Sequence, residues 1–284
     1  MISPNLILGS HQFTAPSGIT FNYLIRGQGP LVVFQSVGWG PVKELEEDFT
    51  VLYFEARGSG GTSRPSSADG MSSRAMGSDL DSLRIHLGQE KLRLLGHSNG
   101  GAIILAYAED FPDKVEKLVL INHELQGFNS DNFQAYVAAR QDHPVYGPAL
   151  KNIFKLMEQP PSTDDEFAEA LHSVLPYYMH DTNKTYLLAD ALKGGSLSLW
   201  NFVNQNKCDS NMKFSAVEGL SKVRARTLVI NGRDDGICSE AAARKVAHEL
   251  GGKAQLVLIE EAGHVPWLEK PVEFFSVVRK FLSS

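Results

Sequence analysis

The chain has 284 residues, a formal net charge of −6 and an isoelectric point near 5.9. Apolar residues make up 43% and charged residues 21%, which excludes a disordered chain and is ample for a full hydrophobic core. The negative charge and the scattered Lys and Arg residues argue against nucleic acid as a partner. The first residues, MISPNLILGSHQF, have no basic segment and only a short apolar stretch, so the sequence predicts no signal peptide or membrane anchor and favours a cytoplasmic location.

Strands and helices alternate in the first part of the chain. The segment from Ser72 to Leu87 has apolar residues at helical spacing and ends at Gly88, a typical residue at a helix C-terminus. A second helix opens at Ser98 and ends before Pro112. The β-rich segments of this part, bounded by turn residues or buried on both faces, are residues 19–26, 31–35, 49–55, 91–96 and 115–122.

The alternation resumes after Arg226, with strands at 227–231 and 254–260 and helices at 241–250 and 272–282. Between the two parts, residues 124–222 carry no strong strand signal. Helical patterns in this stretch cover residues 134–141, 149–158, 166–175, 185–193 and 198–206. The stretch is rich in aromatic residues, most of which we expect in its own core and a minority against a substrate.

This order predicts an α/β fold with a mostly parallel central sheet flanked by helices and an α-helical cap insertion. We place the core domain at residues 1–123 and 223–284 and the cap at 124–222.

The strand at 91–96 runs directly into Gly96-His97-Ser98-Asn99-Gly100, which opens a helix. This strand, sharp turn and helix form the context that a G-x-S-x-G nucleophile elbow requires. Gly96 and Gly100 lack the Cβ atoms that would collide in such a turn, and the turn exposes the serine at the edge of the sheet. The sequence therefore predicts Ser98 as a nucleophile and the Asn99 amide, at a helix N-terminus, as an oxyanion donor. We expect a structural role for His97.

A serine nucleophile needs a base, and the base needs an acid that orients it. Of nine histidines, His264 alone follows a late strand in a Gly-containing loop before a final helix. Asp234 and Asp235 follow the preceding strand and compete for the acid role, because adjacent carboxylates cannot both face one imidazole. We prefer Asp235, with Asp234 shaping the loop; the order Ser, Asp, His then fits the elbow motif.

With these motifs, the chain resembles the α/β-hydrolase superfamily over nearly its whole length. The resemblance rests on GHSNGG, GRDDGIC, EAGHVPWLEKP and FEARGSGGTSRP. It implies the α/β-hydrolase fold with a helical cap and also places the triad acid at Asp235. The general likeness is to proline iminopeptidase-like serine hydrolases, although iminopeptidases resemble one another in a Gly-Gly-Ser-Trp-Gly elbow that this chain lacks.

The loop after residues 31–35 departs from the His-Gly pattern that the resemblance implies, because it reads Gln35-Ser36-Val37-Gly38-Trp39-Gly40. By position, the Val37 amide is the expected second oxyanion donor, with Gly38 as the alternative. Trp39 either lines the acyl pocket or packs in the core. Gly38, Trp39 and Trp267 are the expected substrate contacts.

A Ser98, His264 and Asp235 triad predicts a serine hydrolase that cleaves an ester, lactone or related carbonyl bond through an acyl-enzyme. The aromatic cap favours a mid-sized hydrophobic small molecule as substrate. A carbon–carbon bond hydrolase, an aminopeptidase, a non-hydrolytic biosynthetic enzyme and a ligand-binding receptor on the same fold remain as alternatives. Dehalogenases and epoxide hydrolases of this fold use an aspartate nucleophile, so Ser98 argues against both.

The sequence gives no support for a cofactor. No Cys or His cluster has metal-ligand spacing, no strand leads into a G-x-G-x-x-G loop, and Cys208 and Cys238 are expected to be free thiols. We therefore expect no metal and no organic cofactor, a small-molecule substrate, no nucleic-acid or membrane partner, and a monomer or homodimer.

Overall fold

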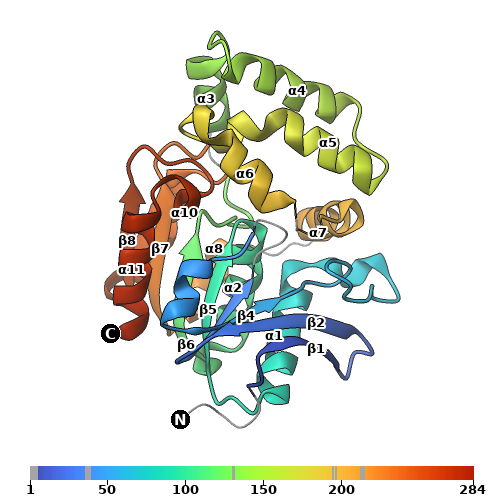
Figure 1. Ribbon diagram of the computed structural model, residues 1–284. Helices are drawn as coiled ribbons and strands as arrows, with labels where there is room; N and C mark the ends of the chain where they lie inside the picture. The colour runs from blue at the N-terminus through green and yellow to red at the C-terminus, as the bar shows by residue number, and fades with distance from the viewer. Residues whose placement is uncertain (1–5, 36–39, 130–131, 194, 196, 212–214) are drawn as a thin grey trace.

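The computed structural model describes residues 6–284 except 36–39, 130–131, 194, 196 and 212–214. The described residues form an eight-stranded sheet in the order β1-β2-β4-β3-β5-β6-β7-β8 (Figure 1). Strands β3 to β8 run parallel to one another, and β1 and β2 add an antiparallel edge. The strands are β1 Gly9–Thr14, β2 Thr20–Gly27, β3 Leu31–Gln35, β4 Thr50–Phe54, β5 Leu92–His97, β6 Val115–Ile121, β7 Arg226–Gly232 and β8 Ala254–Ile259.

Seven of these strands match the predicted β-rich segments, whereas β1 was not predicted. Its residues, GSHQFT, pair with β2 alone and lie at the edge of the sheet, where only Phe13 is buried. Both faces of an edge strand such as β1 are largely exposed and can carry polar residues. Its sequence therefore shows no clear alternation of apolar and polar residues.

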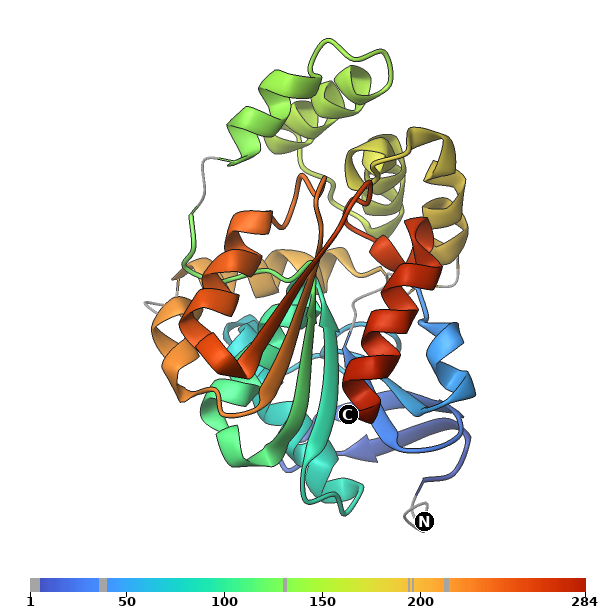
Figure 2. The same ribbon diagram turned by 90° about the vertical axis from the view of Figure 1, so that its left-hand side faces the viewer.

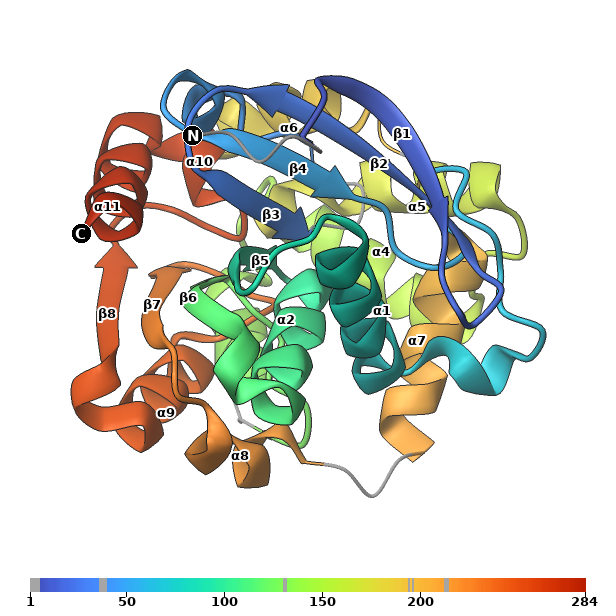
Figure 3. The same ribbon diagram turned by 90° about the horizontal axis from the view of Figure 1, so that it is seen from below.

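Helices cover both faces of the sheet (Figures 2 and 3). Helices α1 and α2 pack with α9 over one apolar layer, and α11 packs on the other. Along the strands the two layers alternate residue by residue; Val33 and Leu94 face the first, whereas Phe34 and Leu95 face the second. The helices of the core are α1 Ser73–His86, α2 Asn99–Asp110, α8 Ala216–Gly219, α9 Glu240–Leu250, α10 Pro266–Glu269 and α11 Pro271–Ser283.

The cap is inserted between β6 and β7, and no strand occurs there among the described residues. Its helices lie beyond the carboxyl ends of the parallel strands (Figure 1). They are α3 Asn132–Arg140, α4 Tyr146–Glu158, α5 Asp164–Val174, α6 Thr185–Leu192 and α7 Leu199–Asn211. The α-helical cap insertion is thus confirmed. Ala216 and Leu220, which fall inside the predicted cap range, are instead buried in the core layer formed with α2 and α9.

Short 3-10 helices connect many of these elements. They are η1 Lys43–Glu47, η2 Ala68–Met71, η3 Pro112–Lys114, η4 Leu175–Tyr178, η5 Thr182–Lys184, η6 Leu220–Lys222 and η7 Gly251–Lys253. In the described part of the chain, every helix is too short or too polar to cross a bilayer.

Candidate active site

Ser98 occupies the sharp turn between β5 and α2. Its φ of 55° and ψ of −126° lie in a region that non-glycine residues rarely adopt. The turn is held by backbone hydrogen bonds, with the Ser98 amide donating to the Ile121 carbonyl at 3.1 Å. A Cβ atom at Gly100 would lie 2.2 Å from the Gln35 carbonyl oxygen, and one at Gly96 would lie 2.6 Å from Ile104. Both glycines are therefore required by close packing, and Ser98 remains partly exposed.

The base and the acid meet at the carboxyl ends of β8 and β7. The His264 Nδ1 atom lies 2.8 Å from the Asp235 Oδ2 atom, and both side chains are fully buried. A histidine that donates from Nδ1 to a carboxylate presents Nε2 as its basic nitrogen. Low solvent access strengthens the attraction between a developing imidazolium and the carboxylate.

Asp235 is fixed by further hydrogen bonds. Its Oδ1 atom accepts from the amides of Ile237 at 2.8 Å and Cys238 at 3.2 Å. Its Oδ2 atom accepts from the Asn122 side-chain amide at 2.7 Å, as well as pairing with His264. The carboxylate therefore faces the imidazole in one orientation, which is what an orienting acid requires.

Asp234, the competing acid, faces the cap instead. Its carboxylate lies 2.7 Å from the His180 Nδ1 atom and accepts from the Arg140 guanidinium at 3.2 Å. The neighbouring carboxylates thus point at different histidines, and Asp235 is the one that reaches His264.

Cys238 lies beside Asp235, His264 and Ser98. Its sulfur is within 4.8 Å of side-chain ligand atoms of Asp235 and His264, and it shares a hydrogen bond with the Ser98 hydroxyl. Burial raises the pKa of the Cys238 thiol well above its ordinary value, so the thiol stays protonated beside the serine.

Asp235, Cys238 and His264 have the donor types of a zinc site. The Asp235 oxygens, however, already accept from two backbone amides, the Asn122 side chain and His264. A metal ion would have to displace these bonds, so the arrangement fits an acid–base pair better than a ligand set.

His97 lies behind the triad and is fully buried. Its Nε2 atom is 2.8 Å from the His264 carbonyl oxygen, and its ring packs edge-on against Trp267 with centroids 4.6 Å apart. Burial, together with the neighbouring His264, holds the pKa of His97 well below its ordinary value, so His97 is neutral. This position agrees with the structural role expected for His97.

The remaining site predictions have different outcomes. Trp267 is 3% exposed and packs in the core, so the structure gives this ring no place in the wall of the described cavities. Val37, Gly38 and Trp39 lie outside the described residues. The Asn99 amide opens α2, and its side chain donates to the Gln205 side chain of the cap at 3.1 Å.

Asn122 is a site residue that the sequence reasoning missed. It follows β6 with a φ of 41°, and its side-chain amide bridges Asp235 and the Gly263 carbonyl oxygen, at 2.7 and 3.1 Å. The available signal was an asparagine directly after a buried parallel strand, at the edge where the strands that carry Asp235 and His264 also end.

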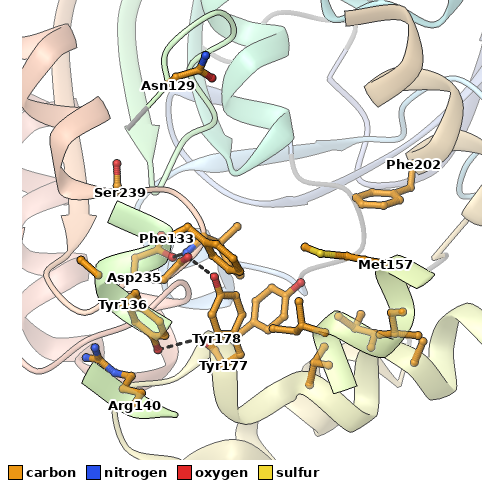
Figure 4. Close-up of a pocket in the computed structure, with 18 of the residues that line it drawn as sticks. Asn129, Phe133, Tyr136, Arg140, Met157, Tyr177, Tyr178, Phe202, Asp235 and Ser239 are labelled. Atoms are coloured by element: carbon orange, nitrogen blue, oxygen red, sulfur yellow. Dashed lines mark hydrogen bonds between the residues drawn. The ribbon is translucent and has the colours of Figure 1, made fainter. Parts of the chain in front are cut away.

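A cavity of about 1020 Å³ opens between the cap and the triad (Figure 4). Asp235 and Tyr178 line it, and the Tyr178 ring packs on the His264 ring with centroids 5.5 Å apart. Arg140 also lines the cavity and lies over the Tyr136 ring, 3.9 Å from its centroid. Ser98 and His264 do not belong to the described lining, so the cavity adjoins the triad on its acid side.

Aromatic residues of the cap form much of the cavity wall. The cap aromatics in its wall are Phe128, Phe133, Tyr136, Phe167, Tyr177, Tyr178 and Phe202. Phe133, Tyr136, Tyr177 and Tyr178 belong both to this wall and to the small cap core. The expectation that a minority of the cap aromatics contacts a substrate stays a prediction.

Known proteins share this fold and sequence pattern. Residues 38–271 match the family model described as alpha/beta hydrolase fold. The AB hydrolase superfamily protein YclE of Bacillus subtilis is 22% identical over 274 residues, which cover 93% of this chain and 96% of that protein. A proline iminopeptidase of Lactobacillus acidophilus is 22% identical, over 84% of this chain and 82% of that protein. The crystal structure of the esterase RhEst1 from Rhodococcus sp. ECU1013 has a TM-score of 0.72 and 21% identity, covering 98% of this chain and 99% of that one.

Proposed function

Because the chain belongs to the alpha/beta hydrolase fold family, we propose that it is a serine hydrolase that cleaves an ester, lactone or related carbonyl bond. The observation that carries this proposal is the 2.8 Å contact between the buried side chains of His264 and Asp235. Ser98 occupies the strained elbow between β5 and α2, and Cys238 lies beside both the serine and this pair.

The mechanism follows from these positions. The Ser98 oxygen attacks the substrate carbonyl carbon, and its proton passes to the His264 Nε2 atom. Asp235 stabilises the imidazolium that forms. The Asn99 amide, at the N-terminus of α2, donates to the oxyanion, and we assign the second donor to the Val37 amide. His264 returns the proton to the leaving group and then activates the water that releases the acid from the acyl-enzyme.

The cavity supports a mid-sized hydrophobic small molecule as the substrate. Its volume of about 1020 Å³ is at the upper end of the range for small-molecule sites, and most of its wall is aromatic or aliphatic. Arg140 lies on the Asp235 side of the cavity, where it pairs with Asp234, and we assign it as the polar group that orients a substrate with a polar substituent.

Hydrolysis of p-nitrophenyl esters of increasing acyl length by the wild type and Ser98→Ala tests the proposal. We expect kcat to fall by roughly 10³-fold or more in the variant, because a triad without its nucleophile retains only binding and oxyanion stabilisation. Melting temperatures of both proteins control for folding.

A serine-directed fluorophosphonate probe provides a second test. We expect it to label the wild type and not Ser98→Ala. A folded wild type that neither turns over esters nor labels would refute the proposal and favour a ligand-binding or non-hydrolytic protein.

A further inference from the structure

The cap contacts the loop of the catalytic base directly. We call residues 177–181, which follow α5, the cap strap. The Tyr178 carbonyl oxygen accepts the His264 backbone amide at 2.7 Å, and the Tyr178 ring packs edge-on against the imidazole. Tyr177 and Tyr178 also line the cavity (Figure 4), so the strap has a substrate-facing side and a His264-facing side.

Glu269 fastens the strap to the base loop. It ends α10, is 3% exposed, and its carboxylate accepts from backbone amides on both sides of this contact. The Gly263 amide, directly before His264, donates to it at 2.6 Å. From the strap, the amides of His180 and Asp181 donate at 3.0 and 2.9 Å.

The chemistry of this contact requires a carboxylate. Both Glu269 oxygens are used, with Gly263 on Oε2, Asp181 on Oε1 and His180 on both. An ionised carboxylate only accepts hydrogen bonds, whereas an amide replaces one acceptor with a donor. Glutamine would therefore turn an NH₂ group toward a backbone N–H and leave a buried donor without an acceptor.

We propose that Glu269 is a positioning residue that sets the orientation of His264 by tying the base loop to the cap strap. The proposal rests on the proposed function of the triad. Since catalytic geometry tolerates errors of well under 1 Å, a shift of the Gly263-His264 backbone lowers the rate of proton transfer from Ser98 more than it weakens substrate binding.

The test compares Glu269→Gln with the control Glu273→Gln, which changes an exposed glutamate on α11. We expect Glu269→Gln to lower kcat and the fluorophosphonate labelling rate of Ser98 by about 10- to 100-fold, with KM within threefold of the wild type. The control should match the wild type. Glu269→Asp, which keeps both acceptors on a shorter stem, should fall between the two and serves as the reporter if Glu269→Gln does not fold.

Two results would overturn the proposal. One is a folded Glu269→Gln whose kcat and labelling rate stay within twofold of the wild type, even if its melting temperature falls. The other is a rise in KM alone, which would assign Glu269 to the cavity and not to His264. Failure of the proposed function is distinct, because there the wild type itself would show no Ser98-dependent turnover.

Discussion

At the residue scale, Asn122 shows how a single side chain holds two parts of the proposed triad in place. Its amide donates to Asp235 Oδ2 and to the Gly263 carbonyl oxygen, so it contacts both the acid and the loop of the base. Asn122 directly follows β6, and its φ of 41° is a backbone conformation that most residues avoid. Asparagine serves both needs, since it tolerates this conformation and carries the donor.

Asn122→Gly and Asn122→Ala separate the two contributions. Both remove the hydrogen bond to Asp235, and we expect kcat for ester hydrolysis to fall about tenfold in each, as suits a bond to a charged group of about 1.5 kcal/mol. Ala also has a strained φ, so we expect its free energy of unfolding in urea to be about 1 kcal/mol below that of Gly. Equal stability of the two variants, or unchanged kcat, would contradict this assignment.

The sequence alone identifies those site residues that a local sequence pattern marks. Ser98 is set by its own turn, and Asp235 and His264 follow strands with strong apolar patterns. Asn122 and Glu269 act through backbone groups that are distant in sequence, and no local pattern marks them. Cys238 was expected to be a free thiol, and it is free, but its place beside Ser98 depends on how the loop after β7 folds back.

At the scale of elements, α7 docks on the core through polar side chains. Asn201 and Gln205, one turn apart, are 0% and 2% exposed. Gln205 accepts from the Asn99 side chain and donates to the Ser73 hydroxyl, each at 3.1 Å. Phe202 and Val203, which a hydrophobic-face argument would bury, are 47% and 48% exposed and line the cavity. The helix could be predicted from periodicity, but its orientation could not, because Phe202 and Val203 on its apolar face turn toward the cavity.

Gln205→Ala tests the docking of α7. We expect the free energy of unfolding in urea to fall by about 1–3 kcal/mol, because the partly buried Asn99 amide loses its Gln205 acceptor and the Ser73 hydroxyl, which still donates to Asp209, loses one of its two partners. Asn206→Ala is the matched control, since Asn206 is partly exposed and, within the described part of the chain, its side chain donates only to the Phe202 carbonyl of its own helix. A control that is as destabilised as Gln205→Ala would show that the network does not hold the helix.

At the scale of the whole molecule, the fold of the described residues raises the pKa of buried carboxyl groups, which therefore stay protonated at higher pH than usual. Burial raises the pKa of Glu124 to about 7, and repulsion from Asp209 adds to the rise. The folded protein then binds a proton that the unfolded chain releases above its ordinary pKa near 4.5. The stabilisation from this group is complete at acidic pH and is lost as the pH rises through 7.

Glu124→Gln checks the sign of this dependence. We expect the melting temperature of the wild type to fall more steeply between pH 5 and pH 8 than that of the variant, which has no carboxyl group to ionise at this position. Parallel curves for the two proteins would refute the raised pKa.

The overall architecture was the most predictable level. Strand and helix alternation indicates a parallel sheet and the long helical stretch indicates the cap, because both signals are spread over many residues. Two features were less predictable. Residues 216–222 pack in the core before β7 begins, and β1 has a single buried residue, which gives too weak a pattern.

The insertion of the cap between β6 and β7 also bears on the protein during its synthesis. The ribosome makes the turn that carries Ser98 first, then the whole cap, and only afterwards the loops that carry Asp235 and His264. A nascent chain released before His264 has a serine without a base to activate it. On the proposed mechanism, hydrolytic activity therefore arises only once translation has passed β8 and His264. Incomplete chains that end earlier lack the base and are not expected to hydrolyse the substrate.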